Sequence, residues 1–227
     1  MKVTALIVAG GKGKRMGAGI NKVFLKLAEK EVIARTVEAF EQNTQIDEIV
    51  IVTGKSDMEA AENILKPFKK VKNIAEGGAE RQQSVYNGLK FVCGDIVLIH
   101  DGARALISQE EIDNVISDCK KYGAAAVGVS CKDTLKSSDN EGFISGTVDR
   151  SSTYMIQTPQ AFKKDIISEL HEKAKNDNLS VTDDCAIAEH YGVKVKITEG
   201  SYDNIKLTTP SDMAAGEIIL RQRGEIQ

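Results

Sequence analysis

Short apolar runs rich in β-branched residues alternate along the chain with longer segments in which apolar residues recur every three or four positions. The short runs are bounded by turn residues, which is typical of strands. The longer segments have one apolar face, which is typical of helices packed on a core. We therefore expect strands at Val3–Val8, Glu48–Val52, Ile96–Ile99, Ala124–Val129 and Val193–Ile197, and helices at Val32–Phe40, Asp57–Phe68, Arg81–Phe91 and Glu110–Tyr122.

The alternation of these elements predicts an α/β fold with a mainly parallel, twisted sheet between helices. Ile49–Val52 and Ile96–Ile99 are apolar at every position, as central strands covered on both faces are. No internal repeat, low-complexity tract or proline-rich linker divides the chain, so we expect one domain over residues 1–227. Ligands of such folds bind at the carboxyl ends of the strands. The segments that follow Val8 and Ile99 are therefore the first places to look for a site.

The pattern breaks between residues 131 and 155. A polar run, Lys136–Gly142, separates two short β-like runs there. This arrangement predicts a hairpin arm that projects from the domain.

The composition excludes some partners. The 227 residues carry a formal net charge of -3, so nothing favours a surface-wide attraction to nucleic acid or to an anionic membrane. No apolar run approaches the roughly 20 residues that span a bilayer. The amino-terminal apolar run leads directly into glycines without a basic leader, which favours a cytoplasmic protein. The four cysteines, at positions 93, 119, 131 and 185, form no C-x-x-C pair, so we expect reduced thiols without a chemical role.

A glycine-rich segment follows the first expected strand. Glycines allow successive backbone N–H groups to face an anion, and nearby basic side chains add positive charge, so a triphosphate is a suitable ligand. The spacing fits neither the P-loop nor the dinucleotide-binding fingerprint. The simpler interpretation is a tight turn with solvated lysines. The residues concerned are Ala9, Gly10, Gly11 and Gly13, with Lys12, Lys14, Arg15 and Lys22 as the basic side chains.

Two further segments carry polar groups at expected element boundaries. Gly77-Gly78 precedes a helix whose free N–H groups, together with Ser84, can bind a base or sugar, although a double glycine is also ordinary turn chemistry. After the strand at Ile96–Ile99, Asp101 can hold Mg²⁺ or substrate hydroxyls and Arg104 can bind a phosphate. A local ion pair that caps the loop would explain Asp101 and Arg104 equally well.

Taken in order, these segments and several later ones resemble the 2-C-methyl-D-erythritol 4-phosphate cytidylyltransferases of the non-mevalonate isoprenoid pathway. The resemblance covers nearly the whole chain. It implies a three-layer α/β/α, Rossmann-like nucleotidyltransferase fold, CTP and a polyol phosphate as substrates, Mg²⁺ without an organic cofactor, and a homodimer joined by the hairpin arm. The matching segments are Gly11–Gly17, Asn21-Lys22, Gly77–Gly88, His100–Arg104, Lys132–Thr134, Thr147–Arg150, Gln157–Gln160, Thr182–Asp184 and Asn204–Thr208.

The resemblance also implies residue roles. Thr134 and Arg150 would serve the acceptor site of the neighbouring subunit, because they lie on the arm. Asp101 would also be the residue that binds the metal ion. The catalytic residues would be Arg15, Lys22 and Lys206; the nucleotide would contact Ala9, Gly10, Gly11, Gly13, Gly78, Ser84 and Asp101; and the acceptor would contact Asp101, Arg104, Thr134, Arg150 and Thr158.

Two departures from the family pattern keep different functions open. Ala105-Leu106 stands where the family usually has Pro-Phe, which removes a ring that would fix the backbone beside Arg104. Ala9-Gly10-Gly11 stands where the family usually has Ala-Ala-Gly, a change shared with the ribitol 5-phosphate cytidylyltransferases. A nucleotidyltransferase for a sugar 1-phosphate shares the fold, and an inactive nucleotide-binding regulator could keep it as well.

Overall fold

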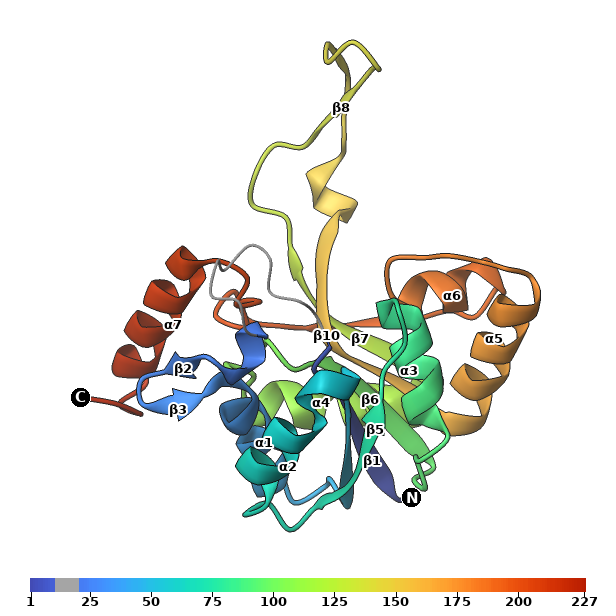
Figure 1. Ribbon diagram of the computed structural model, residues 1–227. Coiled ribbons are helices and arrows are strands. Elements are labelled where there is room, and N and C mark those ends of the chain that lie inside the picture. Colours follow the sequence, from blue (N-terminus) through green and yellow to red (C-terminus); the bar gives the residue numbers. More distant parts are fainter. Residues whose placement is uncertain (11–20) are drawn as a thin grey trace.

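A seven-stranded sheet forms the centre of the molecule, in the strand order β11-β7-β10-β6-β1-β4-β5. The computed structural model describes residues 1–10 and 21–227 (Figure 1). Strand β10 runs antiparallel to both of its neighbours, and the other pairings are parallel. The strands are β1 (Val3–Val8), β4 (Glu48–Thr53), β5 (Val71–Glu76), β6 (Ile96–Asp101), β7 (Ala124–Ser130), β10 (Tyr154–Lys163) and β11 (Lys196–Glu199).

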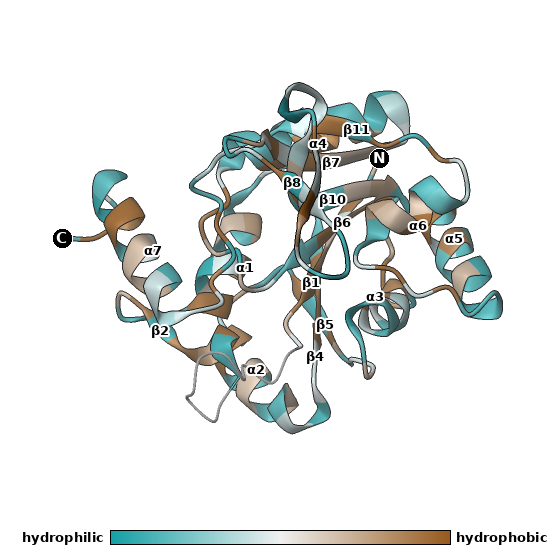
Figure 2. Ribbon diagram, turned by 90° about the horizontal axis from the view of Figure 1, so that it is seen from above, coloured by the Kyte–Doolittle hydropathy of each residue, from teal (hydrophilic) through white to brown (hydrophobic). Residues whose placement is uncertain are grey.

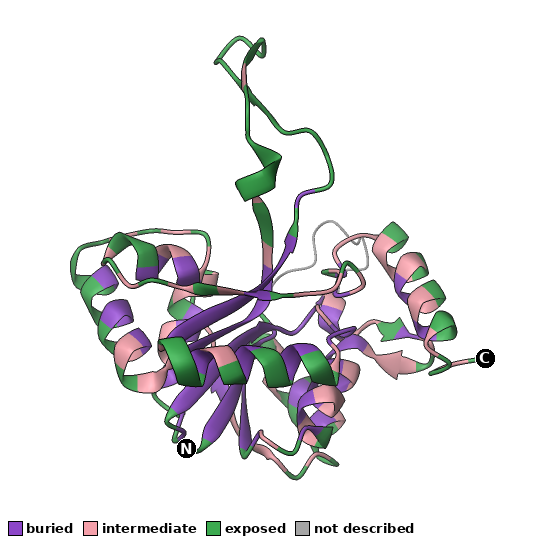
Figure 3. Cartoon of the chain, turned by 180° about the vertical axis from the view of Figure 1, so that it is seen from behind, coloured by how far each residue is buried: buried purple, intermediate pink, exposed green. Residues whose placement is uncertain are grey.

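Both faces of the sheet are covered by helices. In β1, Ala5 and Ile7 belong to one core cluster while Leu6 and Val8 belong to the other, because successive side chains of a strand point to opposite faces. This explains why every residue of β1 is buried. Figure 2 shows the apolar strands at the centre, and Figure 3 shows them as the buried part of the chain. Helices α1 (Val32–Gln42), α2 (Met58–Leu65) and α4 (Gln109–Tyr122) cover one face, and α3 (Arg81–Leu89), α5 (Lys164–Asn176) and α6 (Asp184–His190) cover the other.

Helix α7 (Pro210–Gln222) lies outside these layers and has a small core of its own. Its Leu220 packs in a buried cluster with Leu106, which follows β6, and Leu207, which precedes the helix. The cluster also includes Leu27 of the short strand β2 (Lys26–Leu27), which pairs with β3 (Lys30–Glu31). The carboxyl-terminal helix is therefore fastened to the loop after β6.

The projecting hairpin is present. Strands β8 (Lys136–Ser138) and β9 (Ile144–Thr147) pair in antiparallel fashion, and the arm they form stands away from the sheet (Figure 1). The arm is exposed almost throughout (Figure 3). The predicted three-layer α/β fold with a projecting hairpin is thus confirmed.

Most expected elements lie where local pattern placed them, with shifts at their ends. Helix α4 begins at a capping box formed by Ser108 and Glu111 and ends at Gly123, whose φ of 91° is a left-handed conformation that suits glycine. The predicted strand at Val193–Ile197 begins only at Lys196, and the predicted helix at Asp57–Phe68 is shorter at both ends. Strands β5 and β10 have no counterpart among the expected elements. None of the helices in the described part of the chain is long and apolar enough to cross a bilayer.

Candidate active site

The carboxyl ends of β1 and β6 lie side by side and carry the first site residues. Asp101, the last residue of β6, pairs in register with Val8 of β1, and the Gly102 N–H donates to the Val8 carbonyl at 2.8 Å. A Cβ on Gly102 would lie 3.3 Å from the Cα of Ala9, so a residue without a side chain permits this close approach. Ala9 and the exposed Gly10 are therefore adjacent to Asp101, as the sequence predicted.

Three cationic side chains surround the carboxylate of Asp101. Lys206 Nζ lies 2.7 Å from Oδ2, and the Nε of Arg104 lies 4.0 Å from the same oxygen. Arg81 donates through Nε to Oδ1 at 3.2 Å. Burial by itself would raise the pKa of Asp101, but the charges of Arg81, Lys206 and Arg104 outweigh burial and hold that pKa well below its usual range. Asp101 is ionised at neutral pH, and the cations gathered around it suit the binding of a phosphate.

The loop that carries Lys206 is joined to the loop that carries Arg104. Arg104 Nη1 donates to the Asn204 carbonyl at 2.6 Å, and the Leu207 N–H donates to the Ala103 carbonyl at 2.9 Å. Burial lowers the pKa of Arg104, but a guanidinium remains charged in this position beside Asp101. The predicted residues Asp101, Arg104 and Lys206 thus form one contiguous group.

Thr158 contacts this group from β10, although its hydroxyl faces protein partners. It accepts a hydrogen bond from the Asp101 N–H at 3.0 Å and lies 3.1 Å from His100 Nδ1. The other ring nitrogen, Nε2, lies 3.1 Å from the Arg104 carbonyl, which can only accept. Nε2 therefore carries the proton, and Nδ1 accepts from Thr158. Burial lowers the pKa of His100 to about 4, so the ring is neutral at neutral pH.

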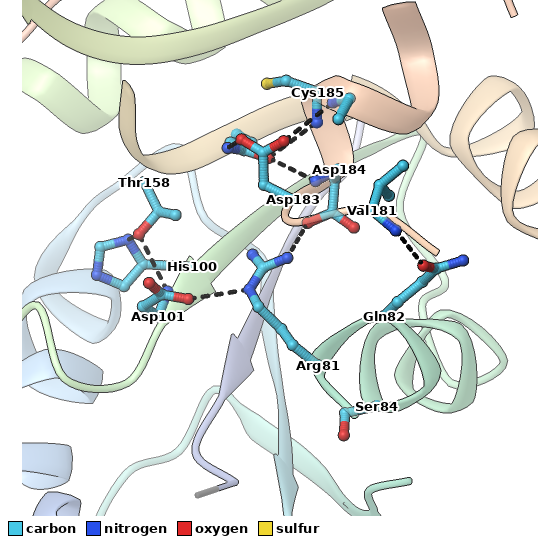
Figure 4. Close-up of polar contacts among 12 residues, drawn as sticks. Arg81, Gln82, Ser84, His100, Asp101, Thr158, Val181, Asp183, Asp184 and Cys185 are labelled. Carbon is cyan, nitrogen blue, oxygen red and sulfur yellow. Dashed lines mark hydrogen bonds and ion pairs between the residues drawn. The ribbon is translucent and has the colours of Figure 1, made fainter. Parts of the chain in front are cut away.

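A second buried carboxylate extends the network beyond the predicted site residues. Arg81, at the start of α3, lies between Asp101 and Asp184 and donates through Nη1 to Asp184 Oδ2 at 2.7 Å (Figure 4). His171 Nε2 lies 2.9 Å from the other oxygen of Asp184. Burial would raise the pKa of Asp184, but Arg81 and His171 outweigh it and keep that pKa below its usual range.

Sequence reasoning missed the ionic role of Arg81, Asp184 and His171. The Thr182-Asp183-Asp184 run has the pattern of a helix cap, and Asp183 indeed accepts from the Ala186 N–H at the start of α6. The only local signal was an arginine three positions after the double glycine. Its partner lies 103 positions away, and no periodicity in the sequence links the two.

The double glycine before α3 forms a tight turn closed by Ser84. The Gly78 N–H donates to Ser84 Oγ at 3.0 Å, and Ser84 Oγ donates to the Glu80 carbonyl at 3.0 Å. A Cβ on Gly77 would lie 2.8 Å from Ser84 Oγ, and one on Gly78 would collide with the side chain of Gln83. The absence of side chains at Gly77 and Gly78 therefore lets Ser84 and Gln83 approach the turn closely.

Lys22 lies close to the end of β1 because its neighbour is anchored there. Asn21 Nδ2 donates to the Ala9 carbonyl and to Asp57 Oδ2, each at 2.8 Å. Lys22 then begins a short 3-10 turn, Lys22–Phe24. The remaining predicted residues of this segment, Gly11, Gly13 and Arg15, lie outside the described residues.

Thr134 and Arg150 are two predicted site residues that the chain does not bring to Asp101. Both are exposed on the arm, and Arg150 Nη1 donates to the Lys132 carbonyl at 3.4 Å. Neither contacts Asp101, Arg104 or Thr158 in the part of the chain that the structure covers. Their predicted role in a neighbouring subunit's site stays a prediction.

The described residues do not form a protein site for a metal ion. No three His, Cys, Asp or Glu side chains among residues 1–10 and 21–227 gather closely enough to hold one. Asp101 is already neutralised by cations, and a divalent ion would have to displace Lys206 from it. Asp101 as a metal ligand therefore stays a prediction.

A three-layer α/β fold with cations gathered at the carboxyl ends of its strands is an arrangement that suits a nucleotidyltransferase. The sequence model of the family described as "IspD: 2-C-methyl-D-erythritol 4-phosphate cytidylyltransferase" matches residues 3–222. The chain belongs to this family.

Individual relatives agree with the assignment. The chain is 46% identical over 225 residues to a Clostridium botulinum protein named 2-C-methyl-D-erythritol 4-phosphate cytidylyltransferase, covering 97% of this chain and 98% of that protein. It is 47% identical over 223 residues to the Clostridium novyi protein of the same name, covering 96% of each. The crystal structure of 4-diphosphocytidyl-2C-methyl-D-erythritol synthase from Anaerococcus prevotii superimposes with a TM-score of 0.88 at 31% identity, covering 97% of this chain and 96% of that one.

The position of Arg81 between two buried carboxylates leads to a prediction for stability. Replacement by methionine leaves Asp101 with one close cation fewer and Asp184 without its guanidinium, so the free energy of unfolding should fall by about 3 kcal/mol. Urea unfolding followed by circular dichroism measures the change. The control is Lys173→Met, which breaks an exposed ion pair with Glu169 and should change stability little. Equal losses in the two variants would contradict the assigned role of Arg81.

The neutral, buried His100 leads to a prediction for pH. The unfolded chain takes up a proton at this residue near pH 6.5, whereas the folded protein takes it up only near pH 4. Stability is therefore complete above pH 6.5 and falls as the pH drops, by about 2 kcal/mol at pH 5 from this group. The depressed pKa values of Asp101 and Asp184 matter only at lower pH.

Urea unfolding of the native protein and of His100→Asn between pH 7 and pH 5 tests this expectation. The variant should show a flatter dependence of unfolding free energy on pH. Parallel pH dependences of the two proteins would show that His100 does not titrate in this way.

Proposed function

We propose that this chain transfers the cytidylyl group of CTP to the phosphate of 2-C-methyl-D-erythritol 4-phosphate and releases pyrophosphate, a step of isoprenoid synthesis. The observation that carries the proposal is the group of cations around Asp101 at the ends of β1 and β6, in a chain that belongs to the cytidylyltransferase family. The acceptor is the one in the names of the two clostridial relatives.

The reaction requires charge compensation more than covalent help. An oxygen of the acceptor phosphate attacks the α-phosphorus of CTP, and a new P–O bond forms. The bond from the α-phosphorus to the oxygen that bridges to the β-phosphorus breaks, and its electron pair leaves on pyrophosphate. Negative charge is crowded onto few oxygens in the transition state, so positioned cations lower the barrier.

The chain supplies such cations from two directions. The ammonium of Lys206 is paired with Asp101, yet its side chain is 42% exposed. A bound phosphate can therefore reach this ammonium from solvent. Lys22 approaches from the segment after β1. We assign Lys206 to the α-phosphate, and Lys22 together with Arg15 to the leaving group. Asp101 keeps the cations directed at one place and can accept hydrogen bonds from substrate hydroxyls.

The acceptor is assigned to the neighbourhood of Arg104. Its guanidinium lies beside Asp101 with its Nη1 fixed on the Asn204 carbonyl, and a guanidinium suits a phosphate because several donors lie in one plane. The Thr158 hydroxyl is used by His100 and the Asp101 N–H, so this residue supports the acceptor site chiefly by fixing the end of β6.

The nucleotide is assigned to the edge formed by Ala9, Gly10, Gly78 and Ser84. These residues present small groups and backbone, and the turn at Gly78 is fixed by Ser84. A base held against backbone and small groups can be selected by its size, so we expect the site to accept a pyrimidine and to reject the larger purine. We expect Mg²⁺ to bind together with the triphosphate, where it would add positive charge that compensates the phosphates.

The proposal includes a homodimer in which each arm completes the site of the other subunit. Phe143 and Ile144 at the tip of the arm are 68% and 69% exposed, and the arm has no core of its own to cover them. Exposed apolar groups of this size favour a protein partner. A second copy of this chain would bury them and bring Thr134 and Arg150 to an acceptor site.

We also place the protein in the cytoplasm. Cys119, Cys131 and Cys185 are buried free thiols, and Cys93 is exposed and free. Unpaired thiols suit a reducing compartment.

A pyrophosphate-release assay with CTP and Mg²⁺ tests the proposed reaction. The native protein should turn over with 2-C-methyl-D-erythritol 4-phosphate and not with D-ribitol 5-phosphate. Lys206→Ala and Lys22→Ala should each lose about 10²- to 10³-fold in kcat, because each removes charge stabilisation of the transition state. Lys196→Ala, which changes an exposed lysine of β11, is the matched control. Turnover with the ribitol compound alone would reject the proposed acceptor, and unchanged kcat in Lys206→Ala would reject the assigned role.

Subunit mixing tests the arm. Lys206→Ala should be inactive because its own site lacks the lysine, although its arm is intact. Arg150→Ala should be weakly active at low acceptor concentration because its arm lacks the guanidinium. A heterodimer would contain one site with an intact core and an intact arm. An equimolar mixture, unfolded together and refolded, should recover about a quarter of native activity if arms act in exchanged fashion across a two-fold axis. A mixture no more active than its components would contradict the exchange.

A further inference from the structure

Arg223, the residue after α7, connects two loops that are far apart in the sequence. Its Nη1 donates to the Leu106 carbonyl at 2.9 Å, and its Nη2 lies 3.4 Å from Asp203 Oδ2. Nη1 also lies 3.9 Å from Glu225. The side chain is only 24% exposed, so the guanidinium is largely covered where it makes these contacts.

The two loops are those that carry the cations of the active site. Leu106 follows Arg104 by two positions, and Asp203 precedes Lys206 by three. Neither Leu106 nor Asp203 lies in a helix or strand. Loops of this kind are more mobile than the elements they connect unless side chains tie them down.

The ties between the loops lie on two sides. On the site side, Lys206 and Arg104 meet at Asp101, and Arg104 binds the Asn204 carbonyl. On the other side, Leu106 and Leu207 pack with Leu220 in the buried cluster beneath α7. Arg223 adds polar contacts on this second side, because it joins the backbone of one loop to a carboxylate of the other.

We propose that Arg223 is a positioning residue for the transfer reaction, which fixes the loop of Arg104 relative to the loop of Lys206 through Leu106 and Asp203. The inference rests on the proposed function. A guanidinium suits this task because its planar, rigid fork donates in two directions at once, whereas a lysine ammonium is a single point charge on a flexible stem. Displacing catalytic groups by about 1 Å can cost roughly 100-fold in rate, so a remote tie of this kind affects turnover.

A purely local role at the end of the helix is the competing interpretation. Arg221 provides the comparison, since it lies on the last turn of the same helix and pairs with Glu217 at 3.6 Å. Among the described residues, no hydrogen bond or ion pair joins Arg221 to either active-site loop. Removal of Arg221 changes the charge of the helix end as removal of Arg223 does, but leaves the two loops tied.

The test compares Arg223→Lys, Arg223→Gln and Asp203→Asn with the control Arg221→Gln. Asp203 is about half exposed, so its variant keeps the core intact even if Arg223→Gln folds poorly. Pyrophosphate release gives kcat and the KM values for CTP and for the acceptor. The variants of Arg223 and Asp203 should each lose roughly 10- to 100-fold in kcat/KM for the acceptor, and the lysine of Arg223→Lys should not restore this value. Arg221→Gln should stay close to native. Thermal unfolding shows that the variants are folded.

Hydrogen exchange adds a readout that does not depend on turnover. Segments 102–107 and 201–207 should exchange faster in Asp203→Asn and Arg223→Lys than in the native protein, while β1 and β6 remain unchanged. If the native protein turns over and the folded variants of Arg223 and Asp203 keep its kcat/KM, the inference is overturned and the proposed function stands. If the native protein turns over with no acceptor, the proposed function is overturned instead. Hydrogen exchange in the two segments would then decide whether Arg223 ties the two loops together.

Discussion

The carboxylate of Asp101 is the group around which the other charged residues of the site are arranged. A carboxylate at the end of a buried strand is stable only when cations and hydrogen-bond donors compensate for the lost water. Lys206, Arg104 and Arg81 provide the cations, and each comes from a different part of the chain. The need to compensate one buried negative charge thus gathers several positive charges at one place. The same gathering prepares the site for phosphates.

The compensation continues away from the substrate side. Arg81 is shared between Asp101 and Asp184, and Asp184 is in turn bound by His171 of α5. Two helices on the same face of the sheet, α3 and α6, are therefore linked to the strand end by ionic contacts in addition to apolar packing (Figure 4). A change in any member of this network leaves another buried charge without its partner. Site geometry and folding stability are coupled for this reason.

Elements outside the sheet complete the arrangement in two ways. Helix α7 and the residue after it contact the loops of Arg104 and Lys206 through Leu220 and Arg223. The hairpin arm instead leads away from the site and leaves Phe143 and Ile144 exposed. One element stabilises the site within the chain, and the other suits an interaction between chains. Both are attached to loops near the carboxyl ends of strands, where changes leave the central sheet intact.

The sequence alone determined the features that depend on neighbours along the chain. Periodicity predicted β1 and α4 closely. The resemblance to the cytidylyltransferases, rather than any local pattern, predicted that Asp101, Arg104 and Lys206 belong together. Tertiary structure decided the rest, because those features depend on partners that no local pattern specifies. The antiparallel insertion of β10 between β6 and β7 is of this kind. So are the pairing of Arg81 with Asp184, the use of the Thr158 hydroxyl by His100, and the joining of two loops by Arg223. Propensity acts over a few residues, whereas these contacts form only when packing brings distant segments together and burial makes an unpaired charge costly.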